Sequence, residues 1–170
     1  MTPRSIKSGI ALSRKRRYKR TLACSGQRIK LGEKLELEVL YAGGVSLGDA
    51  ASALDSNSMV LRLVCGKVSV LLTADIFEET ERYLLDTRFD LSSAVLKVAH
   101  HGSDTSSCLE FLSVVKPQVA VISVGADNTF GHPSPEVVDR LSGSHLYRTD
   151  QQGTIELITD GKRLWVKTEK

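Results

Sequence analysis

The sequence predicts an α/β domain in which helices flank a mixed β-sheet. Between residues 67 and 142, apolar segments rich in β-formers alternate with segments of helical periodicity, the pattern of strand–helix–strand layers. On both sides of this stretch, β-rich segments follow one another across short turns, which is typical of antiparallel hairpins. A sheet that includes both parts has parallel and antiparallel neighbours.

The size and composition fit one globular domain. The chain has 170 residues, of which 41% are hydrophobic and 25% charged, enough for a sizeable core in a soluble protein. No apolar run approaches the roughly 18–20 residues of a membrane span, and the basic start lacks the apolar region of a signal peptide. Cys24, Cys65 and Cys108 are far apart without a CxxC motif, so neither a disulfide framework nor a cysteine metal site is indicated.

The first strands are predicted from alternation and β-propensity. The segment "LELEVLY" (35–41) alternates strictly between apolar and polar residues, as a half-buried strand does. Residues 42–57 are small, polar and glycine-rich, so we expect a loop. The two β-rich runs 58–66 and 67–74 meet at a Gly-Lys pair, which predicts a hairpin.

The helices have recognisable starts and ends. Helical spacing and supporting charges predict a helix over 75–86, and Ser107 with Glu110 has the spacing of a capping box for a helix over 107–116. In "SPEVVDRL", the Ser-Pro pair predicts an N-cap and first helical residue for a helix over 135–142.

The remaining strands are apolar. Residues 93–99 and 118–125 are predicted as buried strands between these helices. The segments "HLYRTD", "GTIELITD" and "RLWVKTE" then predict three closing strands, with turns at Gln-Gly and Asp-Gly.

Polar residues gather where three of the predicted strands end. Asp75 follows the strand over 67–74, His100 and His101 follow the next strand, and the loop after residue 124 contains Asn128 and His132. Ligand sites of open α/β sheets lie beyond the carboxyl ends of the strands, so we expect these residues to meet. One carboxylate with two or three imidazoles is a suitable ligand set for zinc or manganese.

Structural roles compete with this interpretation. Asp75, with Glu78 three residues on, also has the spacing of a helix N-cap. If the strand continues through His100 and His101, their side chains alternate, and only one of them is a ligand while the other supports it. His132, before a proline, also fits a surface loop.

The other polar residues of these loops have alternatives too. Ser103 and the three residues after it are turn and cap formers by default, and Asn128 also fits a turn. Lys97 lies inside a buried strand, so its ammonium must reach solvent or a carboxylate and projects near the strand end. His145 has no partner in view and is interpreted as structural.

The charge is distributed unevenly along the chain. Residues 1–34 contain eleven Lys or Arg and one Glu, a net charge of +10, whereas residues 35–170 carry a net charge of −7. Such a basic run is an electrostatic footprint for nucleic acid, although a solvated helix face or a mobile arm gives the same pattern. A short basic helix is considered over 8–23, and the candidate nucleic-acid contacts are Arg14, Lys15, Arg16, Arg17, Lys19 and Arg20.

Four motifs carry a resemblance to a known family. They are "SNSMVLRL" with "VSVLLTADI", "AVLKVAHHGSDTSS", "KPQVAVISVGADNTFGHPSPEVVDRL" and "YRTDQQGTIEL". In this order they resemble the carboxy-terminal half of the metallo-β-lactamase-like domain of ComEC/Rec2-type competence proteins, which take up transforming DNA. The resemblance covers roughly residues 27–160. We therefore divide the chain into a basic amino-terminal segment (1–26) and a partial metallo-β-lactamase-like domain (27–170).

The resemblance implies a fold and a chemistry. It implies the second half of an αββα sandwich with a two-metal site between the sheets and hydrolysis of DNA phosphodiesters, since two metal ions activate water and clamp both reacting oxygens. Asp75 matches the bridging carboxylate of the family's "LLTGD" motif, and His100 or His101 matches a terminal ligand. Lys97 and His132 match positions near the site in the family, where they could contact a phosphate, and are our further catalytic candidates. Candidate substrate contacts are Ser103, Asn128 and His132.

Two departures from the family pattern matter. Ala74 replaces the glycine of "LLTGD", at a position where a positive φ or a close approach to metal causes strain in alanine. The family's main ligand motif, HxHxDH, is absent, because no histidine precedes His100. A catalytic zinc generally needs three protein ligands. We therefore expect weak or absent metal binding and no nuclease activity from this chain alone.

Three explanations remain for an incomplete site. The chain is an excised or truncated piece of a larger enzyme, half of a site completed by another chain, or a degenerate domain kept for binding; we favour the first. The implied partners are DNA, the amino-terminal half-domain and the transmembrane channel of the same protein. The chain itself is expected to be soluble, and a full-length member would carry this domain outside the cytoplasmic membrane.

The incomplete fold leads to a prediction about self-association, and the incomplete site leads to two alternative functions. One face of the sheet would stay uncovered, which predicts self-association or a repacked amino-terminal helix. The alternative functions are a non-catalytic DNA-binding module that uses Arg14–Arg20, and a related metallo-hydrolase with another phosphoester substrate.

Overall fold

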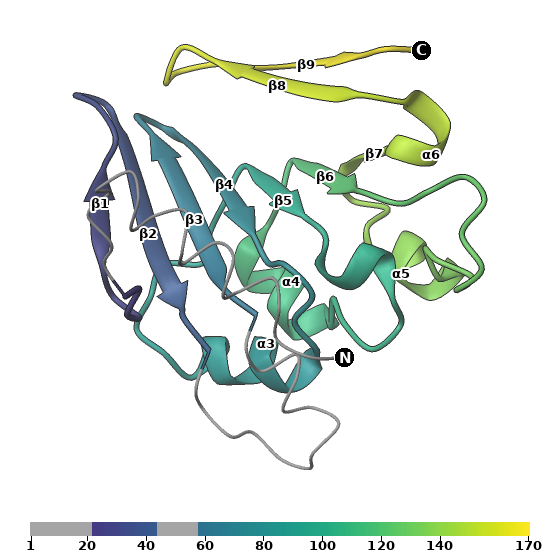
Figure 1. The fold of residues 1–170 in the computed structure, drawn as a ribbon, viewed down its shortest axis with the longest axis horizontal. Helices are drawn as coiled ribbons and strands as arrows, with labels where there is room; N and C mark the ends of the chain where they lie inside the picture. Colours follow the sequence, from purple (N-terminus) through teal and green to yellow (C-terminus); the bar gives the residue numbers. More distant parts are fainter. Residues whose placement is uncertain (1–21, 44–57) are drawn as a thin grey trace, which may run out of the picture.

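A mixed sheet organises the chain in the computed structural model, which describes residues 22–43 and 58–170. Within these ranges seven strands lie side by side in chain order. Strands β1 to β4 pair antiparallel, and β4 to β7 pair parallel (Figure 1). The predicted mixed sheet is therefore confirmed. The strands are β1 (Arg28–Lys30), β2 (Leu35–Tyr41), β3 (Val60–Cys65), β4 (Val68–Leu72), β5 (Val95–Lys97), β6 (Val119–Ile122) and β7 (His145–Arg148).

The strand predictions agree with the structure in most places. The alternating segment is β2 with the bounds that the pattern gave, and the hairpin of β3 and β4 turns between Cys65 and Val68. The loop predicted over 42–57 lies almost entirely outside the described residues. The closing segments form β7, β8 (Ile155–Thr159) and β9 (Leu164–Thr168). Between β7 and β8, a short helix, α6 (Thr149–Gln152), replaces the end of the first predicted strand.

Three helices pack against one face of the sheet: α3 (Glu78–Leu85), α4 (Leu109–Val115) and α5 (Pro135–Arg140). Leu71, Leu96 and Ala120 of neighbouring strands share one buried cluster with residues of these helices, including Phe111 and Val137. Burial of this apolar surface is the main stabilising contribution to the fold. None of the helices in the described ranges has the length and apolar character needed to span a membrane.

The helix starts differ from two sequence-based expectations. Asp75 is not an N-cap, since Phe77 occupies that position of α3. The predicted capping box at Ser107 and Glu110 is wrong, because α4 begins at Leu109 after a Cys108 N-cap residue whose side chain makes no capping bond. The N-cap at the start of α5 is confirmed, since the preceding serine hydroxyl accepts a hydrogen bond from the N–H three residues on.

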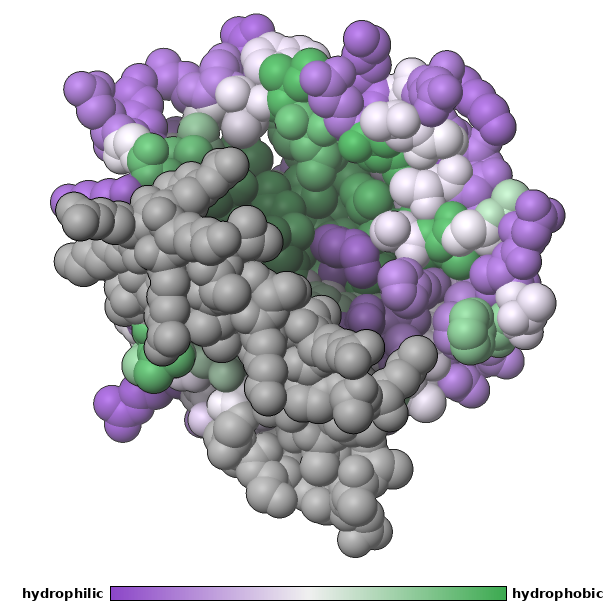
Figure 2. Space-filling view, in the orientation of Figure 1, coloured by the Kyte–Doolittle hydropathy of each residue, from purple (hydrophilic) through white to green (hydrophobic). Residues whose placement is uncertain are grey.

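The face of the sheet opposite the helices is apolar and only half-buried. Leu61 pairs with Leu72 and Leu63 pairs with Val70, so these four side chains share that face. Figure 2 shows apolar side chains gathered in a hollow on the near side of the molecule. The β8–β9 hairpin forms a separate two-stranded sheet beside it (Figure 1).

The hairpin contacts the main sheet through two turns. The Lys67 backbone N–H donates a hydrogen bond of 2.7 Å to the Gly161 carbonyl. A side chain on Gly66 would place its Cβ 2.5 Å from the same carbonyl oxygen, and the φ of Gly66 is +59°. Only glycine satisfies both conditions at this contact.

Candidate functional site

A tight turn after β4 presents Asp75 at the carboxyl edge of the sheet. Ala74 has a φ of +50°, the positive φ that its match to a family glycine led us to consider. The Thr73 hydroxyl donates a hydrogen bond of 2.6 Å to the Lys97 carbonyl at the end of β5. The Ala74 carbonyl accepts one of 3.1 Å from the His100 N–H. The turn that carries Asp75 is thus fixed to the segment that carries the histidine pair.

The histidine pair does not continue the strand. Strand β5 ends at Lys97, and Ala99–Gly102 form a short turn of 3₁₀ character, η1. His100 and His101 both have left-handed backbone angles, with φ of +47° and +55°. The alternation of side chains expected for a strand therefore does not apply. Two successive left-handed residues are unusual outside glycine, which marks a strained local structure.

The ring of His101 faces Asp75. Its Nδ1 lies 2.6 Å from the Ser123 carbonyl oxygen, and its Nε2 lies 3.7 Å from Asp75 Oδ1. Because a carbonyl oxygen only accepts hydrogen bonds, Nδ1 carries a proton, and the neutral ring has its lone pair on Nε2. The lone pair and the carboxylate then face each other, an arrangement that a cation between them stabilises. Ligand histidines in metal sites are oriented by the same kind of bond from the second nitrogen.

The ring of His100 has different surroundings. It packs against Phe77, with ring centroids 4.9 Å apart, and against His132, with centroids 5.9 Å apart. Its Nδ1 is buried and has no hydrogen-bond partner among the described residues. Leaving such an atom unpaired costs about 1–3 kcal/mol. The two histidines thus differ: the ring of His101 is oriented by the Ser123 carbonyl and lies next to Asp75, whereas the ring of His100 packs against Phe77 and His132.

Lys97 ends β5 beside Asp75. Its half-buried side chain donates a hydrogen bond of 2.9 Å from Nζ to the Val98 carbonyl. Burial lowers the pKa of the Lys97 ammonium, and the negative charge of Asp75 opposes this change. The electrostatic influence of Asp75 on Lys97 agrees with a position of the ammonium near the sheet edge.

The loop before α5 is braced by Asn128. Its side-chain nitrogen donates to the carbonyls of Gly125 (2.9 Å) and His132 (2.8 Å), and its oxygen accepts from the His132 N–H (3.1 Å). The amide of Asn128 is thus occupied within the loop. This arrangement supports the turn-forming alternative for Asn128 and leaves little hydrogen-bonding capacity for a substrate.

The same loop is fixed to the histidine turn. The Ser134 N–H donates a hydrogen bond of 2.8 Å to the Gly102 carbonyl. A Cβ on Gly102, whose φ is +84°, would lie 2.6 Å from the Cβ of Pro133. The glycine of the "HHGS" motif therefore permits the two loops to touch.

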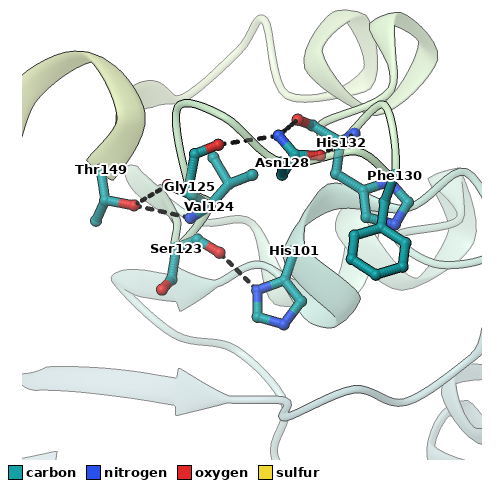
Figure 3. Close-up of a pocket in the computed structure, with 8 residues that line it drawn as sticks. All are labelled: His101, Ser123, Val124, Gly125, Asn128, Phe130, His132 and Thr149. Atoms are coloured by element: carbon teal, nitrogen blue, oxygen red, sulfur yellow. Dashed lines mark hydrogen bonds between the residues drawn. The ribbon is translucent and has the colours of Figure 1, made fainter.

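A pocket of about 420 Å³ opens beside His101. The rings of Phe130 and His132 form part of its lining (Figure 3), with centroids 6.0 Å apart and planes inclined by only 15°. On the other side the Thr149 hydroxyl bonds to both the N–H and the carbonyl of Val124, at 2.7 and 2.8 Å. The lining residues are His101, Ser123, Val124, Gly125, Asn128, Phe130, His132 and Thr149.

Sequence reasoning missed Phe130 and Thr149. Two sequence features could have indicated them. Phe130 is an aromatic residue in a polar loop near His132, and Thr149 directly follows β7. The sequence pattern placed Thr149 at the end of a predicted strand and gave no further signal for Phe130.

Ser103, a predicted substrate contact, and His145, interpreted as structural, do not line this pocket. Ser103 is buried, and its hydroxyl contacts Thr105 Oγ1 at 2.9 Å within the turn that leads to α4, which supports its structural alternative. His145 is exposed at the start of β7. The candidate nucleic-acid residues 14–20 lie outside the described residues.

The described residues fit part of a metal site. Asp75 and His101 present two donors at a separation that one ion with bonds of about 2.0–2.2 Å can bridge. Residues 22–43 and 58–170 contain no group of three or more His, Cys, Asp or Glu side chains that could hold an ion. These residues alone therefore do not provide the three protein ligands of a catalytic zinc site.

The fold places the chain in a structural class. No family profile matches it. A solved structure of a candidate metal-dependent hydrolase from Parabacteroides distasonis aligns with a TM-score of 0.51 at 14% identity, over 82% of this chain and 61% of that one. With the mixed sheet and its covering helices, this similarity confirms a metallo-β-lactamase-like α/β fold.

Comparison with curated proteins shows which proteins of this fold are related in sequence to the chain. ComE operon protein 3 of Bacillus subtilis is 34% identical over 76% of this chain, and competence protein ComA of Neisseria gonorrhoeae is 40% identical over 60%. Recombination protein 2 of Haemophilus influenzae is 39% identical over 59%. The chain therefore contains a segment homologous to ComEC-type competence proteins, as its motifs indicated. It spans only 17%, 15% and 12% of these relatives' lengths.

Proposed function

We propose that this chain is part of a metal-dependent phosphodiesterase domain that acts on DNA during DNA uptake. The observation that carries the proposal is the geometry of His101, whose Nε2 lone pair faces Asp75 Oδ1 at 3.7 Å while Nδ1 is held by the Ser123 carbonyl. Both residues come from motifs that resemble those of the family. The competence-related names of the relatives support DNA uptake as the setting.

Each residue at the sheet edge has a role in this proposal. Asp75 and His101 are ligands of zinc or manganese, and the metal supplies activation of water and stabilisation of charge on the reacting phosphate. Lys97 contributes a positive charge at the phosphate. His132 lines the adjacent pocket and contacts the substrate. His100 packs between Phe77 and His132 and so supports the turn.

The remaining ligands come from another segment in this proposal. Two donors among the described residues hold an ion weakly, so the chain alone is inactive. The family's HxHxDH motif, in the amino-terminal half of the domain, supplies the rest. In the full-length protein, the domain lies outside the cytoplasmic membrane and adjoins a transmembrane channel.

Reconstitution tests the proposal. The amino-terminal half-domain of a ComEC-type protein is co-expressed with this chain, and hydrolysis of labelled DNA is measured with Mn²⁺ or Zn²⁺. We expect metal-dependent cleavage that Asp75→Ala abolishes and that Asp127→Ala, an exposed carboxylate of the next loop, leaves unchanged. An inert complex, or full activity of Asp75→Ala, contradicts the proposal.

A second candidate is a DNA-binding module without catalysis. The net charge of +10 over residues 1–34 favours it, together with the small ligand set among the described residues. Binding through phosphates weakens steeply with salt. Neutralising Arg16 and Arg17 to Gln should weaken binding and flatten its salt dependence, while binding that is insensitive to salt rejects this function.

Two further measurements test the substrate class and the self-association. A panel of other phosphoesters in the reconstituted assay distinguishes a DNA nuclease from a related metallo-hydrolase. The half-buried apolar face that includes Leu61 and Val70 supports the proposed self-association. A molecular mass that rises with concentration in sedimentation experiments is the expected result, and a constant monomer mass contradicts it.

A further inference from the structure

We infer that Phe130 and His132 form a stacking platform for an unpaired DNA base, so that the site takes single-stranded DNA. The inference rests on the proposed function and adds the strandedness of the substrate. Base stacking on aromatic side chains tolerates every sequence, because each base has a flat face. Bases inside a duplex already stack on their neighbours and reach such a platform only after extrusion.

The geometry of the two rings suits this role. Phe130 is 80% exposed, although it is a large apolar side chain. Its ring lies almost parallel to that of His132, with 15° between the planes and 6.0 Å between the centroids. The imidazole therefore supports Phe130 from one side, and much of the phenyl surface remains open to solvent.

The rings connect the pocket to the candidate metal ligands. His132 packs edge-on against His100, which directly precedes His101 in the chain. Figure 3 shows Phe130 and His132 to one side of the His101 ring. Phe130, His132 and His101 line the same pocket, so a base on the platform would lie in the pocket that the candidate ligand His101 borders.

The platform is held in place before any ligand binds. Three hydrogen bonds of Asn128 brace the loop, and the close contact of Gly102 with Pro133 fixes its position on the histidine turn. A prearranged surface loses little conformational entropy on binding. Hydrogen bonds that hold an exposed aromatic ring next to a pocket are expected of a binding element.

Binding of short oligonucleotides to the chain tests the platform. Fluorescence anisotropy at low salt compares a labelled single strand, the same strand with abasic sites, and a duplex. Replacing Phe130 with Ala should weaken binding of the intact strand about 10- to 100-fold, without a comparable effect on the abasic strand or the duplex. Phe130→Tyr should retain binding, and Leu109→Ala, an exposed apolar residue of α4, serves as the matched control.

A second measurement reports stacking directly. Trp165 is the chain's only tryptophan, so Phe130→Trp in a Trp165→Phe background places the single tryptophan on the platform, where it is excited selectively over the tyrosines. The intact strand should quench this fluorescence, and the abasic strand should not.

The possible failures are distinguishable. Equal affinity of wild type and Phe130→Ala for the intact strand, equal losses on the intact and abasic strands, or equal quenching by both strands overturns the platform but leaves the proposed function intact. Absence of binding by the wild-type chain to every probe overturns the platform, whereas the reconstituted cleavage assay separately decides the proposed function.

Discussion

Glu81 of α3 caps α4 through Cys108. The Glu81 carboxylate accepts a hydrogen bond of 2.8 Å from the Cys108 N–H and another of 2.6 Å from the Ser107 N–H. Glu81 is fully buried. The two N–H groups belong to the N-cap residue of α4 and to the residue before it, and a side chain 26 and 27 residues upstream satisfies both. The contact also joins α3 to the start of α4.

Removing this cap should destabilise the domain. Glu81→Ala leaves two buried N–H groups without partners, each of which costs about 1–3 kcal/mol, and we expect a total loss of about 3 kcal/mol. Urea denaturation followed by circular dichroism measures it. Glu110→Ala, at an exposed position in the first turn of α4, should change stability far less. A loss below 1 kcal/mol for Glu81→Ala would show that the cap contributes little.

The same carboxyl group should make stability depend on pH. Burial raises the pKa of Glu81 above 4.5, and the two backbone N–H bonds only partly oppose this. An acid whose pKa is raised by folding favours the folded state below its unfolded pKa, and this contribution is lost as pH rises through the folded value. The unfolding free energy of wild type relative to Glu81→Gln should therefore fall as the pH rises above the ordinary glutamic acid pKa of 4.5. A difference that is constant or that increases with pH contradicts the assignment.

Replacing Ala74 with glycine should stabilise the folded domain. Its φ of +50° lies in the left-handed region, which costs an L-residue roughly 1–2 kcal/mol. The greater freedom of unfolded glycine offsets part of the gain, so Ala74→Gly should stabilise by about 0.5–1 kcal/mol. Thermal denaturation measures the change. Ala126→Gly, at an exposed position without a positive φ, is the matched control and should not stabilise.

Arg62 connects the antiparallel part of the sheet to the loop before β5. Its guanidinium bonds to Glu38 at 2.9 Å and Asp90 at 2.7 Å, and its side chain is only 12% exposed. Arg62→Ala removes the more buried of the two arginine partners of Glu38. The free energy of unfolding should fall by about 2–3 kcal/mol. Arg28→Ala also removes a partner of Glu38, but its side chain is 69% exposed, and we expect less than about 1 kcal/mol. Equal losses in urea denaturation would contradict this ranking.

Local patterns predicted most of the fold. The alternation of 35–41 gave the bounds of β2, and the Ser-Pro pair marked the start of α5, because both signals depend on near neighbours in the sequence. The cap of α4 was mispredicted because the residue that supplies it is distant in sequence. No local spacing rule contains Glu81 as a partner of Cys108.

The sequence predicted that Asp75 lies near the histidine pair, but it did not predict which histidine faces Asp75 or that Phe130 lines the pocket. The carboxyl ends of the strands did bring Asp75 and His101 together. The distinction between His100 and His101 depended on two left-handed residues and on the Ser123 carbonyl, and neither can be deduced from side-chain alternation. Phe130 was missed because its significance lies in the neighbouring ring and pocket rather than in its residue type.

The contact between Gly66 and Gly161 has a consequence for how the two sheets respond to change. The backbones meet there without side chains, so the gap between layers at that end is set by peptide geometry. Any side chain introduced at Gly66 would therefore push the turn of the β8–β9 hairpin away from the main sheet and break the hydrogen bond between Lys67 and Gly161.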